Sequence, residues 1–391
     1  MTARPMDLAP PAPVRLPDSG LGRGWEAATL MGLTLLILSF GLVTLYSASS
    51  VHAIRQGLPD HFYVGRQVVG AAVGLGLLLV TAYLPYKVWE HLSWPLMVGA
   101  SFLLLLCVLP WTYGIAPEVN GARRWLRLGV GFQPSEIAKI AIIVWTAATA
   151  IRKAEHFRSL RRGLGPFLVV WAVPVGLVAA APDLSTALVV FMLGLVIVFA
   201  AGARIGHFIF MGLLLAPVVW WQLQVDYRVE RMREFLGQVS DPSGAGYQVK
   251  QSLVAFGSGG LTGVGIGEGR QKYGFLPEAH NDFIFAMIGE EWGFLGASAL
   301  VVLYLFVVLI GFRIAGRAPD TFGELLAVGC ASFIAIQATL HMAVGLALAP
   351  ATGLALPLVS YGRSNLIVTF VALGILISIA RAAPGGKAVR A

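Results

Sequence analysis

Long apolar blocks alternate with short polar segments along almost the whole chain, and this pattern predicts a bundle of membrane helices. The hydrocarbon core of a bilayer is about 30 Å thick, so a helix needs roughly 20 mostly apolar residues to cross it. Ten blocks approach or exceed that length, although only Ala181, Pro182 and Asp183 lie at the break between the fifth and sixth. The predicted spans are 27–47, 65–84, 92–110, 135–151, 166–182, 184–202, 206–222, 283–311, 322–347 and 364–381.

These blocks divide the chain into one membrane domain and two tails. Residues 25–381 are expected to form an all-α domain of ten spans, with a large extracytoplasmic loop at 223–282 between the seventh and eighth helices. Residues 1–24 are rich in Pro and Gly and lack apolar periodicity, which is typical of a disordered tail, and 382–391 form a second tail. The first span is too long for the core of a signal peptide, so it is expected to remain as an anchor.

Composition excludes a soluble globular protein. The 391 residues are 57% hydrophobic and only 12% charged, whereas soluble domains carry about 25% charged residues. The net charge of +8 does not indicate a nucleic-acid partner, because membrane proteins collect Lys and Arg in cytoplasmic loops and no basic stretch here is interleaved with exposed aromatics. Cys107 and Cys330 lie inside apolar blocks, which favours small buried hydrophobes over a disulfide or a metal site.

The basic residues also predict how the bundle lies in the membrane. Placing the N-terminus inside puts most Lys and Arg of the short segments on the cytoplasmic side, so both termini are predicted to be cytoplasmic. The polar segments 111–134, 223–282 and 357–365 then share the outer face. Each is too polar for lipid and must lie in protein-lined or watery space. Chemistry is therefore expected at the outer face.

Five ionisable residues interrupt the apolar stretch 275–296, although each costs at least ~2.5–3.5 kcal/mol deep in hydrocarbon. Asp282 stands where the large loop re-enters the membrane, and it can serve as a helix-capping acid, as a catalytic carboxylate, or as both. Glu278 could be a second acid or a cation ligand and His280 a hydrogen-bond partner, or both could be exposed loop residues. Glu290 and Glu291 are interpreted as structural, with one of them hydrogen-bonded inside the bundle and paired with a cation on another helix.

Other charged residues permit a structural and a functional interpretation. Glu136 and Lys139 are three residues apart on one helix, so they can form an internal ion pair, or Lys139 can face a cavity that holds a phosphate. Asp183 is expected to be a buried acid with a hydrogen-bond partner. Arg123 and Arg124 precede Trp125, a combination that could hold a phosphate and a sugar face or anchor the loop at the interface.

The glycine-rich segment 257–274 fits neither G-x-G-x-x-G nor the phosphate-loop pattern, so a nucleotide site is not supported. Its backbone N–H groups could converge on an anion, with Arg270 and Lys272 directly after them. A pyrophosphate-contacting loop and a merely flexible loop are both open at this point. No His/Cys cluster has metal-ligand spacing, and there is neither an HExxH nor a G-x-S-x-G motif.

Three stretches together carry a family signature: NGARRWLRLGVGFQPSEIAKI at 120–140, the run 246–296 that ends in EAHNDFIFAMIGEEWGFLG, and GLALPLVSYGRSN at 353–365. They resemble the SEDS family of polytopic bacterial proteins, and the second stretch is closer to its FtsW branch than to RodA. The resemblance implies a peptidoglycan glycosyltransferase of the cytoplasmic membrane that polymerises lipid II. It also implies a class B penicillin-binding protein as partner, other divisome or elongasome membrane proteins nearby, and a role at the division septum more than in elongation.

The resemblance assigns roles to particular residues. The essential aspartate of the family falls on Asp282, its outer tryptophan on Trp125 and its lysine on Lys139. This chain departs from the family at Asn281, which is usually Thr, and at Arg363, which replaces a glycine and adds a cation beside the expected cavity. Arg363 also forbids an easy positive φ at that position.

Together these residues give a mechanistic hypothesis. Asp282 would act as general base on an acceptor hydroxyl, and one base is enough because pyrophosphate is a good leaving group once cations neutralise it. Mg²⁺ or Mn²⁺ could assist, although no metal-binding residues are predicted. A lipid II flippase and a non-catalytic division scaffold are the alternatives. The predicted substrate-binding residues are Lys139, Trp125, Arg123, Arg124, Glu278, His280, Arg270, Lys272, Ser360 and Arg363.

Overall fold

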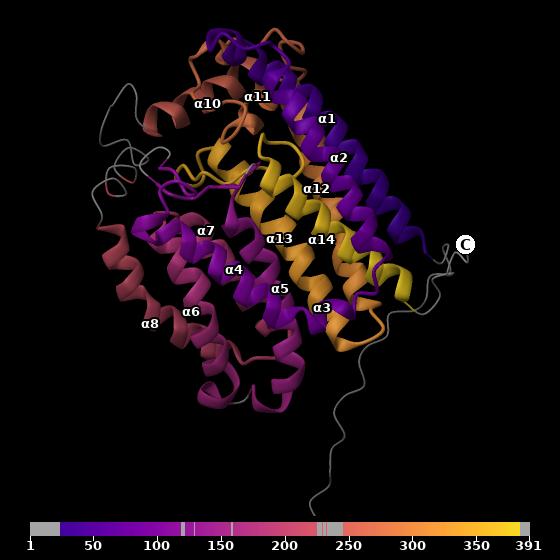
Figure 1. Ribbon diagram of the computed structural model, residues 1–391. Coiled ribbons are helices and arrows are strands. Elements are labelled where there is room, and N and C mark those ends of the chain that lie inside the picture. The colour runs from indigo at the N-terminus through magenta and orange to yellow at the C-terminus, as the bar shows by residue number, and fades with distance from the viewer. Residues whose placement is uncertain are drawn as a thin grey trace, which may run out of the picture.

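The computed structural model shows an all-helical integral membrane fold, as the apolar pattern predicts (Figure 1). It describes residues 24–118, 122–128, 130–157, 159–224, 229, 232 and 245–383. Most of each predicted tail and part of the predicted large loop lie outside the described residues. The long helices run roughly side by side, and α10 and α11 lie together at one end of the bundle (Figure 1).

Each predicted span corresponds to helix in the described part of the chain. Seven helical segments are long and apolar enough to cross a membrane, namely α1, α2, α12, α13, α14, α5 with its 3₁₀ extension and α6 with the turn before it, while α4 and α7 are shorter apolar helices. The bounds are α1 Trp25–Arg55, α2 Phe62–Tyr83, α4 Ser93–Val108, α5 Pro134–Lys153, α6 Gly165–Ala180, α7 Leu184–Ala200, α8 Ile205–Leu223, α13 Thr321–Gly345 and α14 Arg363–Ala382.

The predicted eighth span is not a continuous helix. It is divided into α11, Ile284–Glu291, and α12, Gly293–Gly316, with the break at Trp292. Gly293 adopts φ 67°, a left-handed conformation that glycine reaches without steric cost. A Cβ atom there would also overlap the backbone of Gly263 in the glycine-rich segment. The break therefore depends on two glycines from separate segments.

Parts of the predicted polar loops have regular structure of their own. Within 223–282, a helix α10 covers Ala245–Gly259 and packs against α11. In the first outer loop, β1 (Leu126–Leu128) and β2 (Val130–Phe132) form a two-stranded antiparallel hairpin. The remaining short elements are α3 Val88–His91, the 3₁₀ turns Pro110–Thr112, Ala154–His156 and Gln271–Tyr273, and a π-helical turn Leu160–Leu164.

Small residues let the central helices approach closely. Among the described elements, α2 and α14 make the most extensive helix–helix contact. Gly74 of α2 lies under the Phe370 ring, and Gly374 of α14 lies against Thr81 and the backbone of α2, so neither position has room for a Cβ atom. Close packing of this kind holds membrane helices together, because lipid tails are as apolar as the side chains they would replace.

Arginines near helix ends gather at one end of the bundle. At the end where α1 begins, Glu26 accepts from Arg313 at 3.1 Å and from Arg317 at 2.6 Å, both near the end of α12. Arg381, at the end of α14, donates to the carbonyl of Ala82 at the end of α2. The loops around α10 and α11 lie at the opposite end (Figure 1). The sequence-predicted site residues lie toward this opposite end, away from the arginines near the chain termini.

Candidate active site

A cavity of about 550 Å³ opens at the end of the bundle near α10 and α11. Its wall combines α2, the β1–β2 hairpin, α5, the turn before α11 and the loop that leads into α14, so residues distant in sequence meet there. The lining residues are Arg66, Trp125, Arg127, Gly131, Gln133, Glu136, Glu278, His280, Asn281, Gly353, Ala355, Tyr361, Gly362, Arg363, Ser364 and Asn365.

Asp282 adjoins this cavity without being one of its lining residues. Its side chain is half-buried, and its preceding neighbours His280 and Asn281 line the cavity. Its Oδ2 atom lies 3.9 Å from the position that a Cβ atom on Gly353 would occupy, and Gly353 is also part of the wall. Asp282 is not the N-cap of α11, since Phe283 holds that position and makes no side-chain cap. The helix-capping interpretation of Asp282 is therefore wrong.

The turn before α11 is held in an unusual backbone conformation. Glu278 has φ 53°, in the left-handed region that a non-glycine residue adopts only at a cost of about 1–3 kcal/mol. Its carbonyl accepts from the N–H groups of Asn281 at 3.0 Å and Asp282 at 3.1 Å. These bonds place the Glu278 side chain at the cavity and fix the backbone of Asp282 beside it.

Ser360 joins the loop before α14 to this turn. Its Oγ donates to the Asn281 carbonyl at 2.8 Å and accepts from the N–H of Leu356 at 2.8 Å. The N–H of Tyr361 donates to the His280 carbonyl at 3.1 Å. Ser360 thus contacts protein on both sides and lies behind the cavity wall, where it positions the residues that reach the cavity.

Gln67 of α2 fixes the same loop from another side. Its amide Nε2 donates to the Ser360 carbonyl at 2.9 Å, and its Oε1 accepts from the N–H of Gly362 at 3.2 Å. Gln67 is only 1% exposed, so these bonds are made away from water. Gln67 is not among the predicted site residues, because its one signal in the sequence is a neutral polar side chain inside an apolar span.

Four rings from four segments pack beside the cavity. The His280 ring centroid lies 4.9 Å from that of His52 on α1, 4.9 Å from that of Tyr63 on α2 and 5.9 Å from that of Tyr361. Burial, together with the nearby His52, lowers the pKa of His280 to about 4. His280 is therefore neutral at pH 7 and supplies a ring and a hydrogen-bonding group, but no positive charge.

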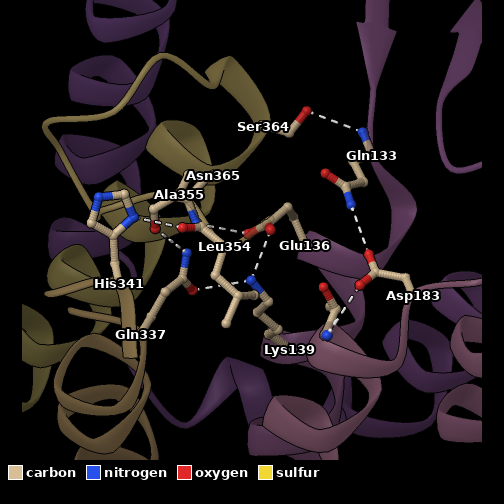
Figure 2. A network of polar contacts seen from close by, with 11 residues as sticks. Gln133, Glu136, Lys139, Asp183, Gln337, His341, Leu354, Ala355, Ser364 and Asn365 are labelled. Atoms are coloured by element: carbon tan, nitrogen blue, oxygen red, sulfur yellow. Dashed lines mark hydrogen bonds and ion pairs between the residues drawn. The ribbon is translucent and has the colours of Figure 1, made fainter. Parts of the chain in front are cut away.

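Lys139 lies below the cavity in a polar network (Figure 2). Its Nζ donates to Glu136 at 2.7 Å and to Gln337 at 3.0 Å, and Lys139 is 0% exposed. Glu136 also accepts from Asn365 at 3.0 Å, and Gln337 donates to the Ala355 carbonyl at 2.8 Å. The structure thus has the internal ion pair that the spacing allows, with Glu136 and not Lys139 reaching the cavity.

Asp183 is the buried acid with hydrogen-bond partners that its position predicts. It accepts from the N–H of Thr186 at 3.2 Å, which caps α7, and from the Gln133 side chain at 3.4 Å (Figure 2). The N–H of Gln133 in turn donates to Ser364 at 3.0 Å. This chain of contacts ties the entry of α5 to α7 and α14, and so sets one side of the cavity wall.

The two arginines before Trp125 bind the protein's own backbone. Arg123 donates to the carbonyls of Leu109 at 2.8 Å and Ala116 at 2.9 Å. Arg124 donates to the carbonyls of residues 181 and 182 in the turn between α6 and α7. Both guanidinium groups shape the first outer loop, and this leaves Trp125 to line the cavity.

The glycine-rich segment packs on the break between α11 and α12. The N–H groups of Val264 and Gly265 donate to the carbonyls of Glu290 and Glu291 at 3.0 and 3.2 Å. Farther along, the Glu290 carboxylate accepts from the backbone N–H of Arg270 at 2.8 Å. Of these N–H groups, that of Arg270 meets an anion, the Glu290 carboxylate, while the other two bind backbone carbonyls.

Lys272 forms the matching ion pair with the neighbouring carboxylate. Its Nζ lies 3.2 Å from Glu291 and 3.2 Å from Ser47 of α1, and it also donates to the Gly267 carbonyl. Both charged side chains are almost completely buried. The structural interpretation of Glu290 and Glu291 is confirmed, but the predicted cation on another helix is wrong, because Lys272 lies in the 3₁₀ turn Gln271–Tyr273.

The structure thus sorts the predicted substrate-binding residues into two groups. Trp125, Glu278, His280 and Arg363 line the cavity, and two further cations in its wall, Arg66 and Arg127, were not predicted as site residues. Their only sequence signal was a positive charge in or beside an outer loop. Within the described residues, no group of three or more His, Cys, Asp or Glu side chains could hold a metal ion. The predicted residues that lie outside the cavity lining are Lys139, Arg123, Arg124, Arg270, Lys272 and Ser360.

The fold and the cavity define a polytopic membrane protein with a polar, cation-bearing site at one end of its bundle. The model of the FtsW/RodA/SpoVE family, described as cell cycle protein, matches residues 27–384. The chain belongs to this family, the SEDS family, and to its FtsW branch.

Individual relatives agree with that membership. The chain is 40% identical over 349 residues to the probable peptidoglycan glycosyltransferase FtsW of Geobacter sulfurreducens, covering 89% of this chain and 93% of the relative. It is 39% identical over 354 residues to the stage V sporulation protein E of Bacillus subtilis, covering 90% and 96%.

Solved structures show the same fold. A chain of a peptidoglycan synthase complex that coordinates polymerization and crosslinking superposes with a TM-score of 0.76 at 30% identity, covering 90% of this chain and 97% of the other. The rod shape determining protein RodA of Thermus thermophilus superposes with a TM-score of 0.64 at 29% identity, covering 91% and 96%.

Proposed function

We propose that the chain is a peptidoglycan glycosyltransferase that polymerises lipid II at the outer face of the cytoplasmic membrane, with Asp282 as general base. The observation that carries this proposal is the position of Asp282, on a fixed turn beside a 550 Å³ cavity lined by cations and aromatic rings. The similarity to relatives named as probable peptidoglycan glycosyltransferases supports the reaction class.

The reaction needs one proton acceptor and a stabilised leaving group. The 4-hydroxyl oxygen of an incoming GlcNAc attacks the anomeric carbon of the MurNAc that carries the growing chain, and its proton passes to the Asp282 carboxylate. The new carbon–oxygen bond forms as the bond to the undecaprenyl pyrophosphate breaks, with inversion at that carbon. A positioned general base typically contributes about 10²–10⁴-fold. Guanidinium groups in the cavity stabilise the charge that develops on the pyrophosphate.

Other wall residues position the sugars. Trp125 offers a large flat ring to a sugar face, and Glu278 offers a carboxylate to sugar hydroxyls from its fixed backbone position. His280 is neutral and packs among the other rings, so it holds the turn and can share a hydrogen bond. The polar network under the cavity keeps Glu136 paired with Lys139 while the substrate binds.

The cellular setting forms part of the proposal. The active complex includes a class B penicillin-binding protein, and both termini of this chain are cytoplasmic, so that the cavity faces outward. Synthesis takes place at the division septum. The similarity to a chain of a peptidoglycan synthase complex supports the partner, and the FtsW branch supports the role in division.

The test is polymerisation in detergent, where no flipping across a membrane is needed. The purified chain with its partner should form glycan strands from lipid II, and Asp282→Asn should lower the rate about 100-fold or more. Glu278→Gln serves as a nearby control and should retain more activity, because Glu278 accepts no proton in this scheme. A wild-type rate in Asp282→Asn would remove the assignment of the base.

A further inference from the structure

Three arginines from three separate elements meet at the cavity. Arg66 lies near the start of α2, Arg127 on β1 and Arg363 at the first residue of α14, and all three line the cavity wall. More than 60 residues separate each from the next along the chain, so only the fold brings them together. None of them is completely buried.

The other cations predicted to contact substrate are largely engaged elsewhere. Lys139 is paired with Glu136, Lys272 is paired with Glu291, and Arg123 and Arg124 donate to backbone carbonyls. By contrast, the guanidinium groups of the three cavity arginines form no ion pair or hydrogen bond with any residue that the structure describes. Their hydrogen-bonding capacity is open to a ligand in the cavity.

The side chains of two of these arginines pack against neighbouring groups. The guanidinium carbon of Arg66 lies 4.8 Å from the centroid of the Phe62 ring, which suits a cation–π contact. The stem of Arg363 passes over Gly70, one turn after Arg66 on α2, and a Cβ atom on Gly70 would stand 3.0 Å from the Arg363 Cγ. The Arg363 side chain therefore lies against the face of α2 that carries Arg66, beside the cavity.

The charge around the cavity favours an anion. Two carboxylates also line it, but Glu136 is already matched by Lys139 and by Asn365. That leaves Glu278 in the wall and Asp282 beside it against three guanidinium groups, and His280 is neutral at pH 7. Arginine presents a planar set of donors that fits phosphate oxygens in pairs, which lysine cannot do.

We infer that Arg66, Arg127 and Arg363 form the binding site for the diphosphate group of the lipid-linked sugar donor. The inference rests on the proposed function for the identity of the donor, while the binding of a diphosphate can be measured separately. The shared chemistry is a phosphate oxygen, which could also come from the headgroup of an ordinary phospholipid. Three cations around one cavity favour a diphosphate, because it carries more charge over a longer span than a single phosphate diester.

The experiment titrates inorganic pyrophosphate into the detergent-solubilised full chain, with divalent ions chelated, and follows binding by tryptophan fluorescence. Arg66→Gln, Arg127→Gln and Arg363→Gln should each weaken binding about tenfold, since each removes charge-assisted hydrogen bonds. Arg270→Gln is the matched control, because Arg270 is exposed at the same end of the molecule but outside the cavity, and it should bind as the wild type does.

Each outcome decides the inference. Unchanged binding in the three cavity variants, or equal weakening in Arg270→Gln, would overturn it. Phosphatidylglycerol micelles that compete as well as pyrophosphate would also overturn it in favour of a phospholipid site. Asp282→Asn should bind pyrophosphate like the wild type while losing polymerisation. If Asp282→Asn still polymerises, only the assignment of Asp282 as general base is wrong. The pyrophosphate binding of the arginine variants tests the diphosphate site independently.

Discussion

At the scale of single residues, the position of Asp282 depends on groups that themselves do no chemistry. Gln67 and Ser360 hold the loop before α14, and Ser360 in turn holds Asn281, the residue before Asp282. Most of these partners are backbone atoms, so substitution of Gln67 or Ser360 would leave buried backbone groups unpaired. An unpaired buried polar group costs about 1–3 kcal/mol. Asp282, the proposed general base, is therefore positioned by a chain of hydrogen bonds that begins on α2.

His280 gives a prediction at the same scale. Its pKa of about 4 lies below the ordinary value of 6.5, because burial and the neighbouring His52 disfavour the charged ring. The unfolded chain therefore takes up the proton first as the pH falls. Stability should be full above about pH 6.5 and should fall as the pH drops toward 4, by at most about 3 kcal/mol.

Thermal unfolding of the detergent-solubilised protein between pH 7.5 and 4.5 measures this effect. His52, Tyr63 and Tyr361 face the His280 ring, and Glu278 lines the same cavity. His280→Gln removes the ionisable ring and should melt with a shallower dependence on pH. Identical slopes in the variant and the wild type would show that other groups set the dependence.

At the scale of elements, the glycine-rich segment packs against the break between α11 and α12. Its backbone bonds to both sides of the break between α11 and α12, and α10 runs into it and packs on α11. Gly259, the last residue of α10, lies so close to the Gly289 carbonyl of α11 that a Cβ atom would overlap it. The turn that carries Asp282 directly precedes α11, so the contact between α10 and α11 affects the position of Asp282.

Gly259→Ala should therefore push α10 away from α11. Overpacking at a buried contact costs about 1–3 kcal/mol, and a backbone carbonyl cannot move aside as a flexible side chain can. Gly257→Ala, two residues earlier in the same helix, is the control, since a Cβ atom there meets nothing within 4 Å. It should be neutral or slightly stabilising, because alanine favours helix over glycine. Melting temperatures that fall equally in both variants would contradict this account.

The elements also show which features can be predicted from sequence. Spans such as α5 and α14 follow from their apolar length alone. The break at Trp292 does not, because Gly263, whose backbone packs against Gly293 at the break, lies on another segment. The helix α10 and the β1–β2 hairpin were missed since neither has the length of a membrane span.

In the candidate site, too, some residues could be predicted from the sequence and others could not. Asp282 and Trp125 were found because local motifs surround them, and the structure places both at or beside the cavity. The sequence could not show which cations are paired inside the protein and which face the cavity, because the partners are distant in sequence. Lys272 contacts Ser47, 225 residues away, and so forms part of a buried pair. Arg66 remains open to a ligand and gave no local signal.

At the scale of the whole molecule, the two ends of the bundle are chemically different. The end opposite the cavity gathers arginines at helix ends, among them Arg313, Arg317 and Arg381. Membrane proteins keep such residues on the cytoplasmic side. The cavity should therefore open outward, where a polymerase would need it, and this orientation can be tested directly.

Cysteine labelling can test this orientation. The two native cysteines, Cys107 and Cys330, are 2% and 0% exposed and should not react with the label. Tyr273→Cys places a thiol at the cavity end, where Tyr273 is 52% exposed, and Glu155→Cys places one at an exposed position toward the other end. A membrane-impermeant maleimide applied to spheroplasts should label Tyr273→Cys at once and Glu155→Cys only after permeabilisation. The reverse order would put the cavity in the cytoplasm, where Asp282 could not join sugars into an external wall.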